Sequence, residues 1–517
     1  MMAAGRLATA DGSVMVARSC DAHGGDASLK TLAVSRKRHD PGEVIRFHES
    51  QMVTIPQISQ TYAYIAVLSD IEGREIAEAE GGINEFQVSA GASSGGALNK
   101  KAQEVCPKMP TSLGDYRMTL VLERAQTAKE GVKLLGEFTE TFGARTDNYI
   151  VADPQEAWLY EEYQGKLWAA VRVPDDCFVV EANTVRIDHV DQGNPNHFMC
   201  SKNLQSFAED TGLYDSGSGE PFNPMKIYGA QTGKVRHGIP APEYDRRRIW
   251  RGISLLAPST TLDAEEPSWV YPLFVKPDKK LTPKDFLDVF NDHYQGTKYD
   301  HYGINRSNYK ASMNAERADN PQSPVQKSSF HINEQRQYQL APIWGTERII
   351  GSTRAITTWC AQLRGWMPNA IGGVFWSGLS EGSTTPHIPW YVGVTRTPEA
   401  FMLGTRKENL LEEGDSGSMY DEKSAYWAFR VITNQVNLFY TALKDEVSPI
   451  WRGWEDKLFV QQPIVESALL DMYKKDPTLA IEFITNYSCD KAEEALMIAK
   501  KMTTRLHTMI AHYNAPL

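Results

Sequence analysis

Arg18, Cys20 and Asp21 bring a positive charge, a thiol and a carboxylate together within four residues near the start of the chain. A thiol beside a positive charge loses its proton more easily, and the thiolate is the nucleophilic form. Cys20 is therefore the first candidate for a nucleophile. The side-chain alternation of a β-strand, however, points Cys20 away from the face that carries Ser19 and Asp21. We therefore do not assign the nucleophile to Cys20.

A β-hairpin is predicted to position these residues. Asp11-Gly12 stands between two apolar runs, and this dipeptide predicts a tight turn in which both residues adopt φ > 0. The second strand then carries Arg18 and Asp21 into one small neighbourhood. A first hairpin taken alone is usually only structural, so its chemistry has to be argued from other features of the chain.

The segment GRLATADGSVMVAR, from Gly5 to Arg18, followed by Asp21, resembles the amino-terminal signature of the dipeptidase A and secernin family. Members are cysteine peptidases of the N-terminal-nucleophile hydrolase class and are related more distantly to bile-salt hydrolases and penicillin acylases. Further matching strings are GINE, ADPQEAW, GKLWAAVRVPDD, CAQLRGWMPNAIGGVFW and IPWYVGVT. The resemblance extends from Gly5 to about Asp445. It implies an α+β fold, the four-layer αββα sandwich of this class.

The resemblance implies that the nucleophile is a cysteine at residue one of the mature chain and that its own α-amine is the base. An α-amine has an ordinary pKa near 8, so it can accept a thiol proton near neutral pH. Alignment on Gly5 and on Asp11-Gly12-Ser13 places that cysteine just upstream of Met1. Three explanations stay open: the natural chain starts earlier, the protein is an inactive relative, or another thiol acts instead.

Four residues receive catalytic roles from the resemblance. Asp21 would hold the terminal amine, and Arg18 would stabilise the thiolate or bind a carboxylate. Asn183 stands where bile-salt hydrolases carry an active-site asparagine, whose amide would donate to the oxyanion. Arg251 is preferred to Arg248 as the arginine that lines the site. The alternatives are a turn-forming role for Asn183 and a surface ion pair for Arg251.

Two further residues are predicted to bind substrate. Asn84 belongs to the GINE string, whose strand lies beside the nucleophile in the family. Trp376 is one of four tryptophans that could shape a substrate pocket, although aromatic residues at this density are mostly core residues. The implied reaction is dipeptide hydrolysis. The alternatives are an amidase or acylase that acts on a non-peptide amide, and a catalytically inactive secernin-like protein.

Composition excludes several classes of partner. The net charge of −11 argues against nucleic acid, because phosphate binding needs a basic surface. The sequence has no apolar run of 18 residues, no CxxC pair and no HExxH motif, so no membrane span, disulfide framework, metal or cofactor is predicted. The expected partners are small peptide substrates and a possible second copy of the chain. A cytoplasmic location is favoured, and secretion stays open if a longer chain carries a signal peptide.

The order of predicted elements fits this fold. Strands dominate to about residue 180, return near residues 357–395, and give way to helices from Ser424 onward. One helix is predicted over residues 120–138, with Thr127 and Glu130 as exposed positions rather than a cap. A strand pair is predicted over residues 148–159 and 167–172. Residues 1–445 are predicted to form the hydrolase domain, and residues 446–517 a helical extension packed on it.

Overall fold

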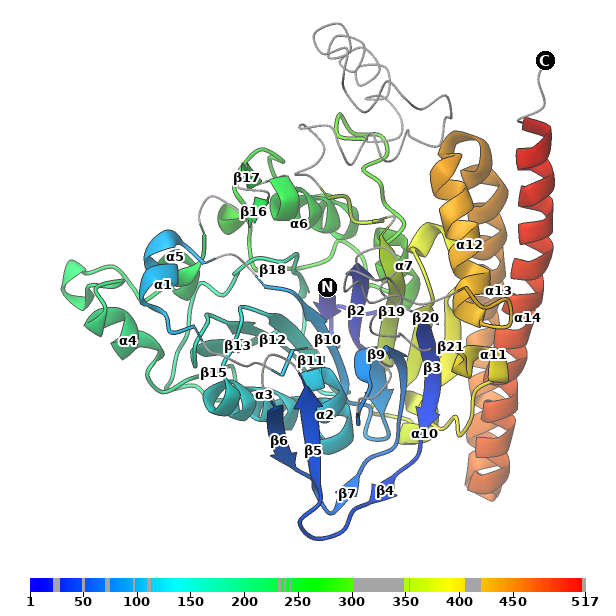
Figure 1. Ribbon diagram of the computed structural model, residues 1–517, viewed down its shortest axis with the longest axis horizontal. Coiled ribbons are helices and arrows are strands. Elements are labelled where there is room, and N and C mark those ends of the chain that lie inside the picture. The colour runs from blue at the N-terminus through cyan, green and yellow to red at the C-terminus, as the bar shows by residue number, and fades with distance from the viewer. Residues whose placement is uncertain are drawn as a thin grey trace, which may run out of the picture.

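Two antiparallel sheets face each other at the centre of the computed structural model (Figure 1). The structure describes residues 1–21, 28–48, 52–69, 75–95, 98–108, 113–114, 116–230, 234–236, 239–241, 243–300, 348–352, 354–404 and 420–513. The strands of the first sheet are, in spatial order, β18 (Phe274–Val275), β14 (Phe178–Val180), β1 (Met2–Ala4), β2 (Val14–Asp21), β19 (Ala355–Leu363), β20 (Val374–Gly378) and β21 (Ile388–Tyr391).

The second sheet supplies the facing layer. Its strands are, in spatial order, β15 (Phe198–Cys200), β13 (Trp168–Arg172), β12 (Ala157–Glu162), β11 (Asn148–Ala152), β10 (Ser89–Ser93), β9 (Glu78–Asn84), β8 (Tyr64–Ser69) and β3 (Leu29–Val34). Strand β2 contacts β10, β11 and β12 across the interface, and β9 contacts β19 and β20. Glycines permit this close approach, because a Cβ at Gly81 would overlap the ring of Trp359.

Helices cover the outer face of each sheet. Helices α2 (Tyr116–Arg124) and α3 (Ala128–Phe142) pack on the second sheet. The first sheet is covered by α6 (Glu243–Leu256), α7 (Pro283–Val289), α12 (Ala425–Leu438), α13 (Tyr440–Lys475) and α14 (Pro477–Tyr513). The predicted four-layer αββα sandwich is therefore confirmed (Figure 1).

Short strands and helices make up further elements of the described residues. The two-stranded pairs are β4 (Lys37–Arg38) with β7 (Gln60–Thr61), β5 (Val44–His48) with β6 (Met52–Pro56), and β16 (Lys234–Arg236) with β17 (Ile239–Ala241). The short helices are α1 (Lys100–Val105), α4 (Leu204–Asp210), α5 (Pro224–Tyr228), α10 (Asn369–Gly372) and α11 (Glu399–Met402).

The first hairpin is confirmed, but its predicted tight turn is wrong. Met2 pairs with Ala17 and Ala4 with Met15, so residues 5–13 form a nine-residue loop between the strands. Gly12 has φ of 80°, whereas Asp11 keeps negative φ and accepts hydrogen bonds from the backbone N and Oγ of Ser13. The residues before Asp11 do not pair with β2. Ala8 N, for example, donates a hydrogen bond to Asp175 O.

The predicted helix over residues 120–138 is two helices. Thr127 is the N-cap of α3, and its side chain accepts a hydrogen bond from Glu130 N at 3.1 Å. Thr127 and Glu130 are exposed, as predicted, but the prediction that they form no cap was wrong. The apolar stripe continues across the break between the two helices, so the sequence pattern conceals the cap. Residues 148–159 likewise divide into β11 and β12, with Asp153 accepting hydrogen bonds from the N–H groups of Gln155 and Glu156 in the turn.

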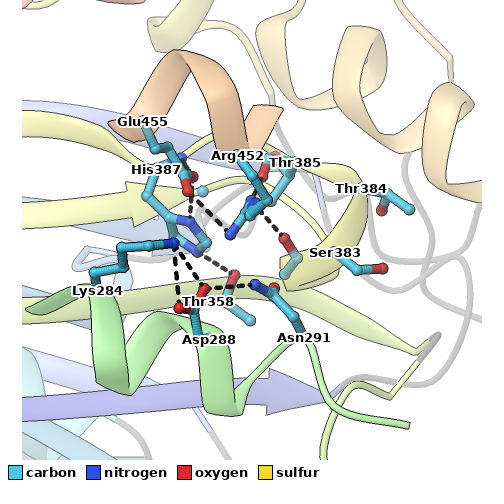
Figure 2. Close-up of polar contacts among 12 residues, drawn as sticks. Lys284, Asp288, Asn291, Thr358, Ser383, Thr384, Thr385, His387, Arg452 and Glu455 are labelled. Atoms are coloured by element: carbon cyan, nitrogen blue, oxygen red, sulfur yellow. Dashed lines mark hydrogen bonds and ion pairs between the residues drawn. The ribbon is translucent and has the colours of Figure 1, made fainter. Parts of the chain in front are cut away.

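A buried polar network joins helix α13 to the first sheet. Figure 2 shows Glu455 of α13 between His387 and Arg452. His387 Nδ1 lies 2.8 Å from Glu455 Oε1, Arg452 Nη1 lies 2.9 Å from Glu455 Oε2, and His387 Nε2 lies 2.9 Å from Thr358 Oγ1 of β19. The predicted domain boundary at residues 445 and 446 falls inside α13, and α12 already belongs to the same helical layer.

Candidate active site

A cavity of about 50 Å³ opens at the start of β1. It lies where β1, β2, the end of β14, helix α6 and the segments after α7 and before β19 converge. Its lining residues are Met1, Met2, Ser19, Asp21, Val180, Glu181, Ala182, Arg248, Val289, Phe290, Ile349 and Ile350. The ends of the inner strands β14, β1 and β2, together with α6, thus bring a terminal amine, two carboxylates and a guanidinium to one place.

The α-amine of Met1 is buried and donates a hydrogen bond to Glu181 O at 2.8 Å. Burial lowers the pKa of this amine to about 6, because charge is costly away from water. The Glu181 carboxylate opposes the shift, whereas the charges of Arg248 and Arg18 add to it. An amine with this pKa is largely neutral at pH 7, so it can accept a proton from a neighbouring group.

Glu181 is a functional candidate that sequence reasoning missed. Its backbone N donates to Met1 O at 2.9 Å, which continues the pairing of β14 with β1. Its buried carboxylate accepts from Ser93 Oγ at 2.8 Å and from Asn148 Nδ2 at 2.9 Å. These donors keep a negative charge fixed beside the amine. The only signal in the sequence is a charged residue that interrupts the apolar run before Ala182.

Asp21 lines the cavity as predicted. Its Oδ2 lies 3.1 Å from Arg348 Nη1, and its Oδ1 is buried and accepts no hydrogen bond from the part of the chain that the structure describes. A carboxylate oxygen of this kind can still bind a donor that enters the cavity. The negative charge of Asp21 also raises the pKa of the Met1 amine, against the effect of burial.

Arg18 does not line the cavity, which corrects the prediction that it shares a neighbourhood with Asp21. The two residues are three positions apart, so they lie on opposite faces of β2. Arg18 Nη1 is buried between the sheets and donates to Glu80 O at 2.6 Å and to Glu80 Oε2 at 3.0 Å. Cys20 lies on the same face and donates to Glu80 Oε2, so its predicted orientation away from Asp21 is confirmed.

Arg248, not Arg251, is the arginine at the cavity. Its Nη1 donates to Asn183 Oδ1 at 3.0 Å, and Asn183 Nδ2 donates to Ser94 O at 2.6 Å. Arg251 instead forms two hydrogen bonds to Asp292, at 2.9 and 2.7 Å. Both arginines lie on α6, three positions apart, and their guanidinium groups bind different partners.

Comparisons with known proteins identify the family of this chain. The family model Peptidase family C69 matches residues 1–453. The chain belongs to peptidase family C69. It is 29% identical over 399 residues to a probable dipeptidase A of Streptococcus pyogenes serotype M18, covering 77% of this chain and 75% of the relative. It is 27% identical over 451 residues to a probable dipeptidase of Latilactobacillus sakei, covering 86% and 82% respectively.

Solved structures also match this chain, and one of those that match is a bile acid hydrolase. A conjugated bile acid hydrolase from Clostridium perfringens is 10% identical to this C69 peptidase, with a TM-score of 0.30, covering 82% of this chain and 97% of that chain. A likeness at this score adds nothing to the fold assignment, which rests on the two sheets and their covering helices.

The two residues predicted to bind substrate lie elsewhere in this C69 peptidase. Asn84 is buried beneath α2 and donates to Leu122 O and Ala125 O at 3.0 and 2.7 Å. Trp376 packs its ring against Phe459 of α13, with 4.4 Å between ring centroids. Both positions are in the core and neither lines the cavity, so the prediction that they contact substrate is corrected.

Two further findings concern the described residues only. These residues contain no group of three or more histidine, cysteine, aspartate or glutamate side chains that could hold a metal ion. Nor does any helix among them have the length and apolar character needed to cross a membrane.

The terminal amine of this peptidase is expected to titrate near pH 6 in protein whose first residue is Met1. The cause is its burial against Glu181 O, since an exposed α-amine titrates near 8. The measurement is the pH dependence of competitive acetylation of the terminus, followed by mass spectrometry. The urea-unfolded protein is the control and should return a value of about 8. A folded-state value near 8 would contradict the buried geometry.

Proposed function

We propose that this C69 peptidase hydrolyses the peptide bond of dipeptides through a thiol on its N-terminal residue. The observation that carries the proposal is the cavity at the start of β1, where the first residue lies beside Asp21, Glu181 and Arg248. The named dipeptidases among its relatives support the same substrate class. Met1 to Ala4 carry no thiol. The proposal therefore concerns a form of the protein whose first residue is a cysteine at this cavity, and the α-amine of that cysteine is the base.

The reaction is an acyl transfer in two steps. The terminal α-amine takes the thiol proton while sulfur attacks the peptide carbonyl carbon, and the carbonyl oxygen becomes an oxyanion. The C–N bond then breaks, the leaving amine takes the proton, and a thioester stays on the enzyme. Water then attacks the thioester while the same amine takes a proton from that water. The C–S bond breaks, the N-terminal amino acid of the dipeptide leaves as a carboxylic acid, and the amine returns the proton to sulfur.

The charged groups at the cavity suggest how a free dipeptide is oriented. Asp21 offers a buried carboxylate oxygen to the substrate's ammonium group, and Arg248 offers positive charge to its carboxylate or to the oxyanion. Asn183 holds the Arg248 guanidinium through its side-chain oxygen. In this proposal Asn183 is a positioning residue. Arg18 acts on the amine only through its charge from the opposite face of β2.

The test compares substrates on a form of the protein that begins with cysteine. A free dipeptide should be cleaved at least tenfold faster, in kcat/KM, than its N-acetyl form and its C-terminal amide, because each modification removes one charged contact. Arg248→Lys should reduce this preference against the amide, whereas Arg251→Lys, whose partner is Asp292, should not. Faster cleavage of penicillin V or a conjugated bile acid would overturn the proposal in favour of an acylase.

We place this activity in the cytoplasm. All six cysteines are free, and free thiols are typical of a reducing compartment. Fractionation of cells that produce the full natural chain decides between cytoplasm and secretion.

A further inference from the structure

The two most exposed large apolar side chains among the described residues stand side by side on α13. Val460 is 73% exposed and Ile464 is 70% exposed. They are four residues apart, so they lie one helical turn from each other on the same face. Single exposed apolar side chains are common, but an adjacent pair at this exposure suggests that the face is covered by something.

The exposed face of α13 has the spacing of a coiled-coil seam. Gly453, Lys457, Val460, Ile464, Ser467 and Asp471 follow each other at intervals of four, three, four, three and four residues, and all are exposed. This 3.5-residue repeat keeps one stripe in contact with a neighbouring helix. The opposite stripe, which includes Trp451, Glu455, Leu458 and Leu469, is buried against the rest of the chain. Helix α13 therefore presents one occupied face and one open face.

The open face is complementary to itself. Lys457 and Asp471 lie seven residues before and after Ile464, on the same stripe. A second α13 laid antiparallel, with the two-fold axis at Ile464, places each Lys457 beside the partner copy's Asp471. A parallel arrangement would place lysine against lysine and aspartate against aspartate. Small exposed side chains at Ser467 and Ala468 leave room for two helices to approach closely.

We propose that a second copy of this chain docks antiparallel on the outer face of α13 and forms a two-fold symmetric dimer. A self-complementary patch is what a two-fold interface requires, because the same residues serve both partners. Val460 and Ile464 supply most of the contact, because exposed ion pairs contribute little free energy. The charges of Lys457 and Asp471 select the antiparallel orientation. In the single chain Asp471 contacts only the exposed Lys474, at 3.4 Å among the described residues, so it is readily exchanged.

The location of this face separates it from catalysis. Residues 454–475 of α13 lie beyond the segment that matches the C69 family model. The stripe from Lys457 to Asp471 rises about 21 Å along the helix, which is short for a large interface. We therefore expect a dimer whose dissociation constant lies in roughly the micromolar range.

The experiment is sedimentation velocity of the full chain over a hundredfold range of concentration. The wild-type protein should shift from monomer to dimer, and Ile464→Glu should stay monomeric throughout. Leu479→Glu is the matched control, because Leu479 is an exposed apolar residue on α14 outside the stripe. It should dimerise like wild type. Equal thermal midpoints of all three would show that folding is intact.

A charge exchange tests the antiparallel orientation. Lys457→Asp alone should weaken the dimer about tenfold, and adding Asp471→Lys to the same chain should restore it, because both pairs are then simply reversed. A wild-type protein that is monomeric at every concentration would overturn the proposal. So would a dimer that survives Ile464→Glu, or a double exchange that fails to restore association. None of these outcomes depends on peptidase activity.

Discussion

A form of this peptidase that begins with cysteine is expected to cleave dipeptides, whereas the form that begins with Met1 is expected to leave them intact. The cavity already holds a buried amine of lowered pKa, two carboxylates and a guanidinium, but no thiol lies at the start of β1. Loss of a nucleophile costs many orders of magnitude in kcat, and the remaining contacts retain roughly 10³–10⁴ over water in well-studied triads. The expected difference is therefore the largest that this site can produce.

The experiment compares forms that differ only at the first residue. Cysteine is placed at position 1, as Met1→Cys, or immediately ahead of Met1, and is exposed by removal of the initiator methionine. Activity towards a dipeptide panel is measured with and without iodoacetamide. Serine at the same position is the matched control, because it keeps the α-amine and the size but replaces the thiol. Only the cysteine forms should be active and sensitive to alkylation.

Two results would contradict this expectation. Full activity of the form that begins with Met1 would point to another thiol, and Cys20→Ala would then identify or exclude Cys20. Inactivity of every cysteine form, with folding intact, would favour the inactive relative. The structure already argues against Cys20, because its Sγ donates to Glu80 Oε2 on the face of β2 away from the cavity.

The layered fold was predictable from the sequence, but the register of its site residues was not. Strand runs, helix runs and family strings indicated the αββα sandwich. The choice between Arg248 and Arg251 needed the rotation of α6, which local sequence does not specify because both arginines find carbonyl or carboxylate partners. Glu181 was missed for a different reason: its three hydrogen-bond donors come from residues distant in sequence or from its own turn.

Side-chain alternation explains one success and one failure on the same strand. It correctly directed Cys20 away from Asp21, yet the same rule separates Arg18 from Asp21, because Arg18 and Cys20 are two positions apart. Applied consistently, it would have placed Arg18 between the sheets. The core positions of Asn84 and Trp376 depend on helices α2 and α13, which pack from far along the chain.

Glu455 is expected to be one of the strongest stabilising residues of the helical layer. Burial alone raises the pKa of its carboxyl, but the charges of Arg452 and His387 and its hydrogen bonds hold that pKa below its ordinary value. Glu455→Gln removes the negative charge, so that Arg452 and His387 lose the carboxylate that lies between them (Figure 2). Breaking a buried pair from one side costs about 3–5 kcal/mol, so the free energy of unfolding should fall by about 3 kcal/mol.

The pH dependence of this loss separates the charge from simple packing. A carboxyl whose pKa is lowered by folding contributes stability above its unfolded pKa of about 4.3, and this contribution disappears as the pH falls through the folded value. The difference between wild type and Glu455→Gln in urea unfolding should therefore be full at pH 7 and shrink below about pH 4. Asp456→Asn on α13 is the control, and it should change stability by less than about 1 kcal/mol because the ion pair of Asp456 with Lys284 is exposed to solvent. A difference for Glu455→Gln that stays constant with pH would contradict the ionic role, because a loss of packing does not depend on pH.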